Sequence, residues 1–219
     1  MTEAGPAGAP FPEGTLGAEG LACVRSERVV FLDLSFTVRS GEVLVLRGPN
    51  GSGKSSLLRL IAGLLPAADG TLTWNGTSVR ADRDAHRARL DYVGHVDAVK
   101  AALSVRENLE FWAALAGKTG AETAALKRFG LIELADLPAR FLSAGQQRRL
   151  NLARLGASGA ALWLLDEPAV SLDQPSVLAL HDLIQAHRTR GGISVIASHG
   201  DIEVEGARIL HLGPQGTAP

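Results

Sequence analysis

The chain has 219 residues and a single cysteine, Cys23, which is enough length for one α/β domain with a sizeable core and excludes an internal disulfide. Its net charge of -1, with both signs mixed along the sequence, argues against a basic surface for nucleic acid or anionic lipid, so direct nucleic-acid binding is not expected. Apolar stretches such as LIAGLLPAA at 60–68 are shorter than the ~20 residues that span a bilayer, and no basic-then-apolar signal follows Met1. We therefore expect a cytosolic protein without direct membrane insertion, or one held at a membrane by another subunit.

The first part of the chain predicts a flexible tail and then strands. Residues 1–19 are rich in Gly, Pro and Ala and show no apolar period, which is typical of a tail. The runs VVFLDLSFTV at 29–38 and EVLVLRG at 42–48 are typical of strands. TLTWNGTSV at 71–79 predicts a hairpin that turns at Asn75–Gly76. These segments predict a small β region beside the first candidate site.

The segment GPNGSGKSS at 48–56 predicts a phosphate-binding loop. It follows a strand and opens the helical run SSLLRLIAGL, which is the context that the pattern GxxxxGK[ST] requires. Its glycines let the backbone curl around an anion, so that successive amides point inward. Lys54 adds a charge between the β- and γ-phosphates, and Ser55 offers a hydroxyl to Mg²⁺. The residues expected to contact the nucleotide are Gly48, Pro49, Asn50, Gly51, Ser52, Gly53, Lys54, Ser55 and Ser56.

The middle of the chain, about residues 96–145, predicts an inserted helical subdomain. SVRENLEFWAALAG at 104–117 and AETAALKRFGLIELADL at 121–137 carry apolar residues at helical spacing. The glycine-containing stretch Gly117–Gly120 is typical of a break between two helices.

LSAGQQRRL at 142–150 predicts a second anion site. Ser143 and Gly145 stand just before a helix-compatible run, which turns free backbone amides and a hydroxyl toward an anion. An ordinary N-capped helix would give the same local pattern. Arg148 and Arg149 are expected to be packing and surface cations rather than catalysts.

The strand ALWLLDE at 161–167 predicts the partner of the phosphate loop. A buried parallel strand would place Asp166 at its carboxyl end, beside a loop that follows another strand of the sheet. Asp166 is then expected to hold Mg²⁺ through water, and Glu167 to orient and deprotonate the attacking water. A solvated strand end without a metal is the alternative for this dipeptide alone.

The last part predicts a helix from near Gln174 to about Arg190 and a strand GISVIAS that ends at His199. Short apolar runs that alternate with helices indicate a mainly parallel sheet covered on both faces. We therefore expect one α/β domain over residues 20–213, followed by a tail at 214–219.

Five segments together resemble one family. GPNGSGKS, LSAGQQRR, LLDEP, SLD and the strand-terminal His199 occur in the order and approximate spacing of ATP-binding-cassette (ABC) ATPases. The resemblance implies a P-loop NTPase fold of the ABC type, with a mainly parallel core, a flanking antiparallel β region and the helical insertion. It also implies hydrolysis of ATP with Mg²⁺ in a head-to-tail homodimer, where each ATP lies between the phosphate loop of one subunit and the LSAGQ signature of the other.

The resemblance assigns further residues to that shared site. In the signature, the residues placed on the nucleotide of the partner are Ser143, Ala144, Gly145 and Gln146. Asp173 of SLD matches a loop at the dimer interface, where it also caps the next helix, and His199 matches a sensor of the γ-phosphate. Two positions depart from the family pattern. Arg25 stands where an aromatic residue usually stacks on adenine, and His95 stands where a glutamine usually contacts water or Mg²⁺, a role that His95 can fill with a charge that depends on pH.

Within the family, three stretches are most similar to the ATP-binding subunit of bacterial haem exporters in c-type cytochrome maturation. They are GH at 94–95, KAALSVRENLEFW at 100–112 and LSAGQQRRLNLARL at 142–155. This likeness implies a subunit docked on integral membrane subunits at the cytoplasmic face of the bacterial inner membrane. An exporter with another cargo remains an alternative. A soluble ABC ATPase that acts on ribosomes or DNA is a further one, although the tandem cassettes and coiled coils usual in that class do not occur here.

Overall fold

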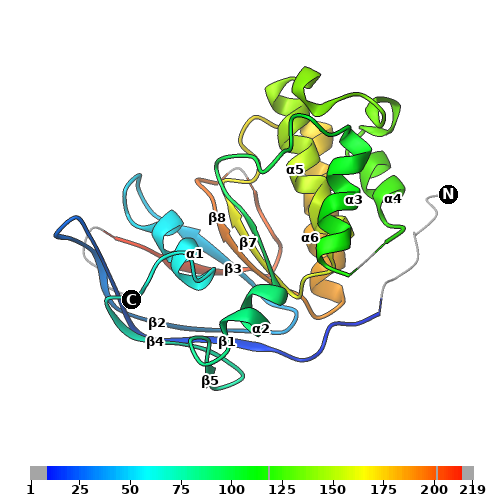
Figure 1. Cartoon of the computed structure of the whole chain (residues 1–219). Helices are drawn as coiled ribbons and strands as arrows, with labels where there is room; N and C mark the ends of the chain where they lie inside the picture. Colours follow the sequence, from blue (N-terminus) through cyan, green and yellow to red (C-terminus); the bar gives the residue numbers. More distant parts are fainter. Residues whose placement is uncertain (1–8, 118, 201, 214–219) are drawn as a thin grey trace.

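The computed structural model describes residues 9–117, 119–200 and 202–213. Two β-sheets form its framework, and helix α1 (Lys54–Ile61) lies between them (Figure 1). The expected tail at 214–219, the first eight residues of the expected N-terminal tail, and Lys118 of the expected helix break lie outside the described residues.

The larger sheet is parallel throughout and has five strands. In spatial order these are β6 (Leu90–Val93), β7 (Leu162–Asp166), β8 (Ile193–Ala197), β3 (Val43–Arg47) and β9 (Arg208–His211). The strands β7 and β8 are buried along their whole length, as expected for a parallel sheet covered on both faces. The sequence-based prediction of this sheet is therefore confirmed.

The smaller sheet is antiparallel and has four strands. In spatial order these are β2 (Arg28–Arg39), β1 (Thr15–Arg25), β4 (Asp69–Trp74) and β5 (Thr77–Ser78). The β4–β5 turn is at Asn75 and Gly76, both with positive φ, which confirms the predicted hairpin. The expectation of a loose tail up to residue 19 is wrong, because β1 begins at Thr15. There, Leu16 and Ala18 point into the core while their backbone pairs with β2 and β4.

Two groups of helices complete the fold. The short α2 (Arg83–Ala88) precedes β6, and α3 (Val105–Leu115), α4 (Glu122–Arg128), α5 (Ala144–Ser158) and α6 (Gln174–Thr189) gather on one side of the molecule (Figure 1). Two 3₁₀ turns, Ile132–Leu134 and Ala139–Phe141, connect α4 to α5. Ser104 begins α3 with a capping box to Glu107. In the part of the chain that the structure describes, none of the helices combines the length and apolar character needed to cross a membrane.

The core divides at the parallel sheet because successive side chains of a strand point to opposite faces. On β3, Leu44 and Leu46 pack with α1 and the antiparallel sheet, whereas Val43 and Val45 pack with the helices of the other layer. Both faces are apolar, so the sheet is fixed from both sides. This arrangement holds the carboxyl ends of β3, β7 and β8 at one edge, where the candidate site lies.

Candidate functional site

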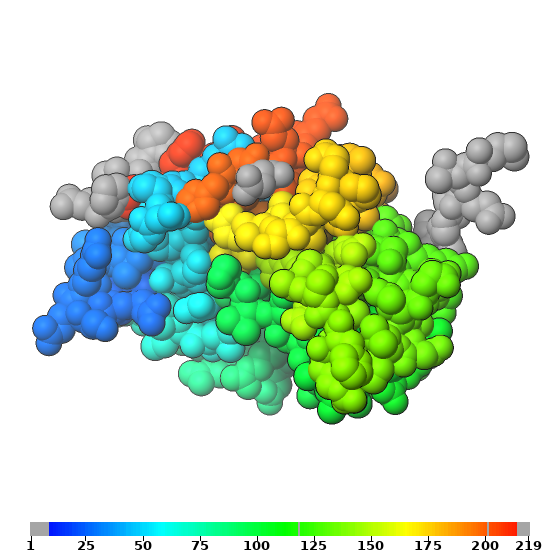
Figure 2. All heavy atoms as spheres, turned by 90° about the horizontal axis from the view of Figure 1, so that it is seen from above, coloured from blue at the N-terminus to red at the C-terminus, as the bar shows by residue number. Residues whose placement is uncertain are grey.

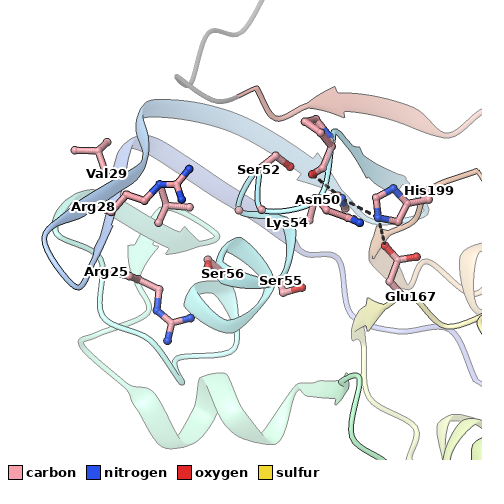
Figure 3. Close-up of a pocket in the computed structure, with 14 residues that line it drawn as sticks. Arg25, Arg28, Val29, Asn50, Ser52, Lys54, Ser55, Ser56, Glu167 and His199 are labelled. Carbon is pink, nitrogen blue, oxygen red and sulfur yellow. Dashed lines mark hydrogen bonds and ion pairs between the residues drawn. The ribbon is translucent and has the colours of Figure 1, made fainter.

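The site is a cavity of about 380 Å³ at the carboxyl ends of three parallel strands. The loop after β3 forms the floor of the cavity. Glu167, which directly follows β7, and His199, in the loop after β8, line it as well (Figure 3). The tip of the β1–β2 hairpin closes its far end. The cavity is lined by Arg25, Arg28, Val29, Val30, Pro49, Asn50, Gly51, Ser52, Gly53, Lys54, Ser55, Ser56, Glu167 and His199.

The loop after β3 has the backbone of a phosphate cradle. Gly48 and Gly53 have φ of 153° and 102°, values that favour glycine. A Cβ on Gly48 would meet the Leu212 carbonyl at 2.1 Å, and one on Gly53 would meet the Val30 side chain at 2.6 Å. Ser52 Oγ is buried and has no hydrogen-bond partner among the described residues. The loop therefore leaves an unsatisfied polar atom where a bound phosphate would supply a partner.

Lys54 begins α1 with its ammonium inside the cradle. Nζ donates to the carbonyl oxygens of Gly48 at 2.8 Å and Pro49 at 3.3 Å, and lies 3.3 Å from His199 Nε2. The side chain is buried, and no carboxylate of the described chain lies within ion-pair distance of it. A buried cation that lacks a carboxylate partner favours the binding of an anionic ligand.

Ser55 and Asp166 form an oxygen pair that fits Mg²⁺. Ser55 Oγ donates to Asp166 Oδ1 at 2.9 Å across the α1–β7 contact, and Tyr92 Oη lies 3.5 Å from Asp166 Oδ2. The described residues contain no cluster of three or more His, Cys, Asp or Glu side chains suited to a metal. A Mg²⁺ ion with few protein ligands, completed by phosphate oxygens and water, matches this sparse set.

Glu167 is held in a left-handed backbone conformation, with φ of 48°, directly after β7. Its Oε1 lies 3.4 Å from His199 Nε2 (Figure 3). Burial raises the pKa of the Glu167 carboxyl above its ordinary value, and the nearby His199 and Lys54 oppose that rise. A carboxylate with a raised pKa beside the expected γ-phosphate position suits a general base.

The signature segment lies outside this cavity. Ser143 is the N-cap of α5, where its hydroxyl accepts from Gln146 N at 3.3 Å and its own N–H donates to Gln146 Oε1 at 2.8 Å. The Ser143 side chain is exposed and does not line the cavity. Figure 2 shows the phosphate loop in cyan, the segment after β7 in yellow and the start of α5 in yellow-green on one face.

Two other predicted site residues also lie apart from the cavity. Asp173 is exposed and caps α6 by accepting from Ser176 N at 3.1 Å, as expected of a capping residue. His95 is exposed after β6 and lines a different hollow, together with Arg59 and Trp112. The structure thus brings Lys54, Ser55, Asp166, Glu167 and His199 together but does not bring Asp173 or His95 to them.

The family model described as ABC transporter matches residues 31–170, which include the phosphate loop, the signature and the strand with Asp166. The chain belongs to the ABC transporter family.

Individual relatives of the ABC transporter family agree with this assignment. A cytochrome c biogenesis ATP-binding export protein CcmA of Paramagnetospirillum magneticum is 55% identical, covering 91% of this chain and 94% of that protein. The protein of the same name from Rhodospirillum rubrum is 54% identical, covering 94% and 90%. A solved ATP-binding subunit of an ABC transporter has a TM-score of 0.77 at 24% identity, covering 84% of this chain and 79% of the other, and so supports the fold. As an ABC ATPase, the chain binds and hydrolyses ATP.

Two arginines of this ABC ATPase were not assigned to the site by sequence reasoning. Arg28 lines the cavity beside Arg25, at the opposite side of the same turn, which no family motif marked. Arg148 was expected to be a packing cation, and it is buried, but its guanidinium also reaches the end of β7. It donates to the carbonyl oxygens of Asp166 at 3.2 Å and Glu167 at 2.8 Å. The arginine pattern of α5 alone did not reveal this long-range contact.

Proposed function

We propose that this chain is the ATP-hydrolysing subunit of a membrane transport complex in c-type cytochrome biogenesis, which exports haem or releases a haem-loaded chaperone. The observation that carries this proposal is the identity of 54–55%, over at least nine tenths of the chain, with proteins named as ATP-binding exporters of cytochrome c biogenesis. Such similarity covers the whole ABC domain rather than the shared nucleotide motifs alone.

The cavity supplies the groups that ATP hydrolysis needs. Lys54 would bind the β- and γ-phosphates, and Ser55 with Asp166 would hold Mg²⁺. When bound, Mg²⁺ would neutralise charge on the phosphate oxygens. Glu167 would take the proton of the attacking water, and His199 would sense the γ-phosphate from its position between Glu167 and Lys54. His95 would need a movement of the loop after β6 to take part in the same site.

The site would be completed by a second copy of the chain. Ser143 is exposed and lies outside the cavity of its own chain. The start of α5 lies on the same face as the phosphate loop (Figure 2). In a head-to-tail homodimer, the segment Ser143–Gln146 would meet the γ-phosphate of the partner's ATP, with Asp173 at the interface. The helix N-terminus would contribute roughly 0.3 to 2 kcal/mol to holding that anion. Integral membrane subunits would hold this dimer at the cytoplasmic face of the inner membrane.

The bacterium that encodes this chain provides the test. Deletion of the gene should abolish covalent haem attachment, measured by haem staining of denaturing gels, and the wild-type chain should restore it. Glu167→Gln should not restore it, whereas Glu19→Gln, which alters an exposed residue of β1, should. Normal covalent haem in the deletion strain would refute the assignment to cytochrome biogenesis and favour another cargo.

A further inference from the structure

The Asp166 carboxylate has one hydroxyl donor on each of its two oxygens. Ser55 Oγ donates to Oδ1 at 2.9 Å, and Tyr92 Oη donates to Oδ2 at 3.5 Å. Asp166 is 3% exposed, and none of the ion pairs among the described residues includes it. Two neutral donors therefore orient the carboxylate without cancelling the negative charge that attracts a divalent cation.

The parallel sheet brings Tyr92 to Asp166 from the neighbouring strand. β6 and β7 pair Tyr92 with Leu164, which is two residues before Asp166. Side chains two residues apart in a strand point to the same face of the sheet, so Leu164 and Asp166 share a face. Leu164 and Tyr92 both pack in the core that contains α1 and the antiparallel sheet. The phenol of Tyr92 thus reaches Asp166 from β6, whereas Ser55 reaches it from α1.

The residues around Tyr92 hold it in place. Its carbonyl oxygen accepts from the Arg154 guanidinium of α5. Its ring lies against Gly94, where a Cβ would come within 3.1 Å of Tyr92 Cε1 and 3.2 Å of Tyr92 Oη. The Gly94 carbonyl accepts from Arg148 Nη1 at 2.9 Å. Gly94 therefore leaves space for the Tyr92 hydroxyl, and the backbone of both residues is bonded to α5.

The two hydroxyl donors differ in their expected relation to the ion. Ser55 lines the nucleotide cavity, and its oxygen is expected to contact Mg²⁺ directly. Tyr92 does not line that cavity, so its hydroxyl is left to contact Asp166 alone. Groups that hydrogen-bond to a metal ligand orient that ligand, and their removal typically weakens metal binding or activity roughly 10- to 100-fold.

We propose that Tyr92 is a positioning residue for the magnesium site: its hydroxyl orients the Asp166 carboxylate toward the ion, and Gly94 leaves the space that this hydroxyl needs. The proposal rests on the proposed function of the same cavity in binding ATP with Mg²⁺. Removal of the hydroxyl should affect the metal and not the binding of metal-free nucleotide. The bond from Tyr92 is long, so the effect should be near the lower limit, about tenfold weaker metal binding.

Binding of Mn²⁺, a paramagnetic substitute for Mg²⁺, tests this without turnover. The full-length chain is kept in excess over AMP-PNP, a non-hydrolysable ATP analogue, and electron paramagnetic resonance records the free Mn²⁺ during a titration. Tyr92→Phe, which removes only the hydroxyl, should raise the Kd for Mn²⁺ about tenfold. The half-saturating Mg²⁺ concentration for ATP hydrolysis should rise by the same factor. Binding of a fluorescent ATP in EDTA should not change, because the phosphate loop is intact.

Two further variants set the scale of the effect. Asp166→Asn removes the carboxylate charge and should weaken Mn²⁺ binding more than Tyr92→Phe does. Thr77→Val removes an exposed hydroxyl of β5 and should match the wild type. An unchanged Kd for Mn²⁺ in Tyr92→Phe would refute the positioning role and leave the ATPase function standing. A wild-type complex that binds Mn²⁺ no more tightly than free AMP-PNP does would refute the metal site and the positioning role together.

Gly94→Ala tests the space beside the phenol. The added methyl group should displace the Tyr92 hydroxyl and weaken Mn²⁺ binding in the wild-type background. In the Tyr92→Phe background, where the hydroxyl is already absent, the same substitution should change the Kd for Mn²⁺ little, since the two changes act on one contact. A loss of equal size in both backgrounds would contradict the role of Gly94 in placing the hydroxyl.

Discussion

Glu167 stands at the point where hydrolysis is expected to begin, with its carboxylate directed at His199 from a left-handed backbone position. Replacement by Gln keeps the size and polarity of the side chain but removes its ability to take a proton. We expect Glu167→Gln to bind ATP with nearly unchanged affinity and to hydrolyse it at least about 100-fold more slowly. Single-turnover measurement of phosphate release, beside equilibrium binding of ATP, separates the two effects. Unchanged turnover would remove Glu167 from the role of base.

His187 is a buried neutral side chain that links stability to pH. Its ring stacks on Trp163 at 3.7 Å, Nε2 donates to the Ala160 carbonyl at 3.0 Å, and Nδ1 lies 3.3 Å from Ser194 Oγ. Burial lowers the pKa of His187 from 6.5 to about 4, with a smaller lowering by Arg190, while the hydrogen bond to Ala160 raises it. The unfolded chain therefore binds more protons between these two values, and the free energy of unfolding falls as pH drops through that window.

We expect this linkage to remove up to about 3 kcal/mol of stability between pH 6.5 and pH 4. Urea unfolding at pH 7 and pH 4.5 measures it. His187→Phe keeps a stacked ring but loses the titrating group, so it should be less stable at pH 7 and lose less stability on acidification. His211→Gln, at an exposed histidine of β9, should follow the wild type. Parallel curves for wild type and His187→Phe would contradict the role of His187.

At the scale of elements, Arg148 ties α5 to the ends of two strands. From α5 it donates to the Gly94 carbonyl after β6 at 2.9 Å and to the carbonyls of Asp166 and Glu167 at the end of β7, and it pairs with Asp97 at 3.0 Å. This contact joins the helix that begins at the signature to the residue that is expected to act as base.

We expect Arg148→Met to lower the free energy of unfolding by about 3 kcal/mol. The substitution removes one hydrogen-bond donor from the Asp97 carboxylate and from each of three buried carbonyl oxygens. Hydrolysis should fall more than ATP affinity, since the carbonyls of Asp166 and Glu167 lose a donor while the phosphate loop does not. Arg149→Met, one position along and partly exposed, should cost less than about 1 kcal/mol. Chemical denaturation measures the stability of the two variants, and steady-state kinetics measures their hydrolysis. Equal effects of Arg148→Met and Arg149→Met would contradict the role of Arg148 in joining α5 to the ends of β6 and β7.

Sequence alone predicted the elements whose signals are local. The glycines around Lys54, the apolar run before Asp166 and the Asn75–Gly76 turn each carry a backbone or burial requirement within a few residues. It failed for β1, because Gly17, Ala18 and Glu19 have little strand preference and pairing with β2 and β4 fixes them. It also missed the contacts of Arg148, which join positions 18 and more residues apart through the tertiary fold.

Considered as a whole molecule, the chain carries two parts of a nucleotide site on one face but does not join them. The cavity holds Lys54, Ser55 and Glu167, while Ser143 opens α5 outside it. A monomer therefore has a phosphate loop without its signature contact, and a signature without a nucleotide. We propose that two copies arranged head to tail would satisfy both parts at once.

Mixing two inactive variants tests that claim most directly. Lys54→Ala removes the phosphate contact of one half-site, and Ser143→Arg blocks the signature of the other, so each variant alone should lose ATPase activity. In a mixed dimer one composite site combines an intact Lys54 with an intact Ser143, whereas the other carries both defects. Equal mixing should therefore restore about a quarter of wild-type activity, since half of the dimers are mixed and each has one working site. Mixtures that remain as inactive as either parent, under conditions where mixed dimers are detected, would contradict a site shared between two copies.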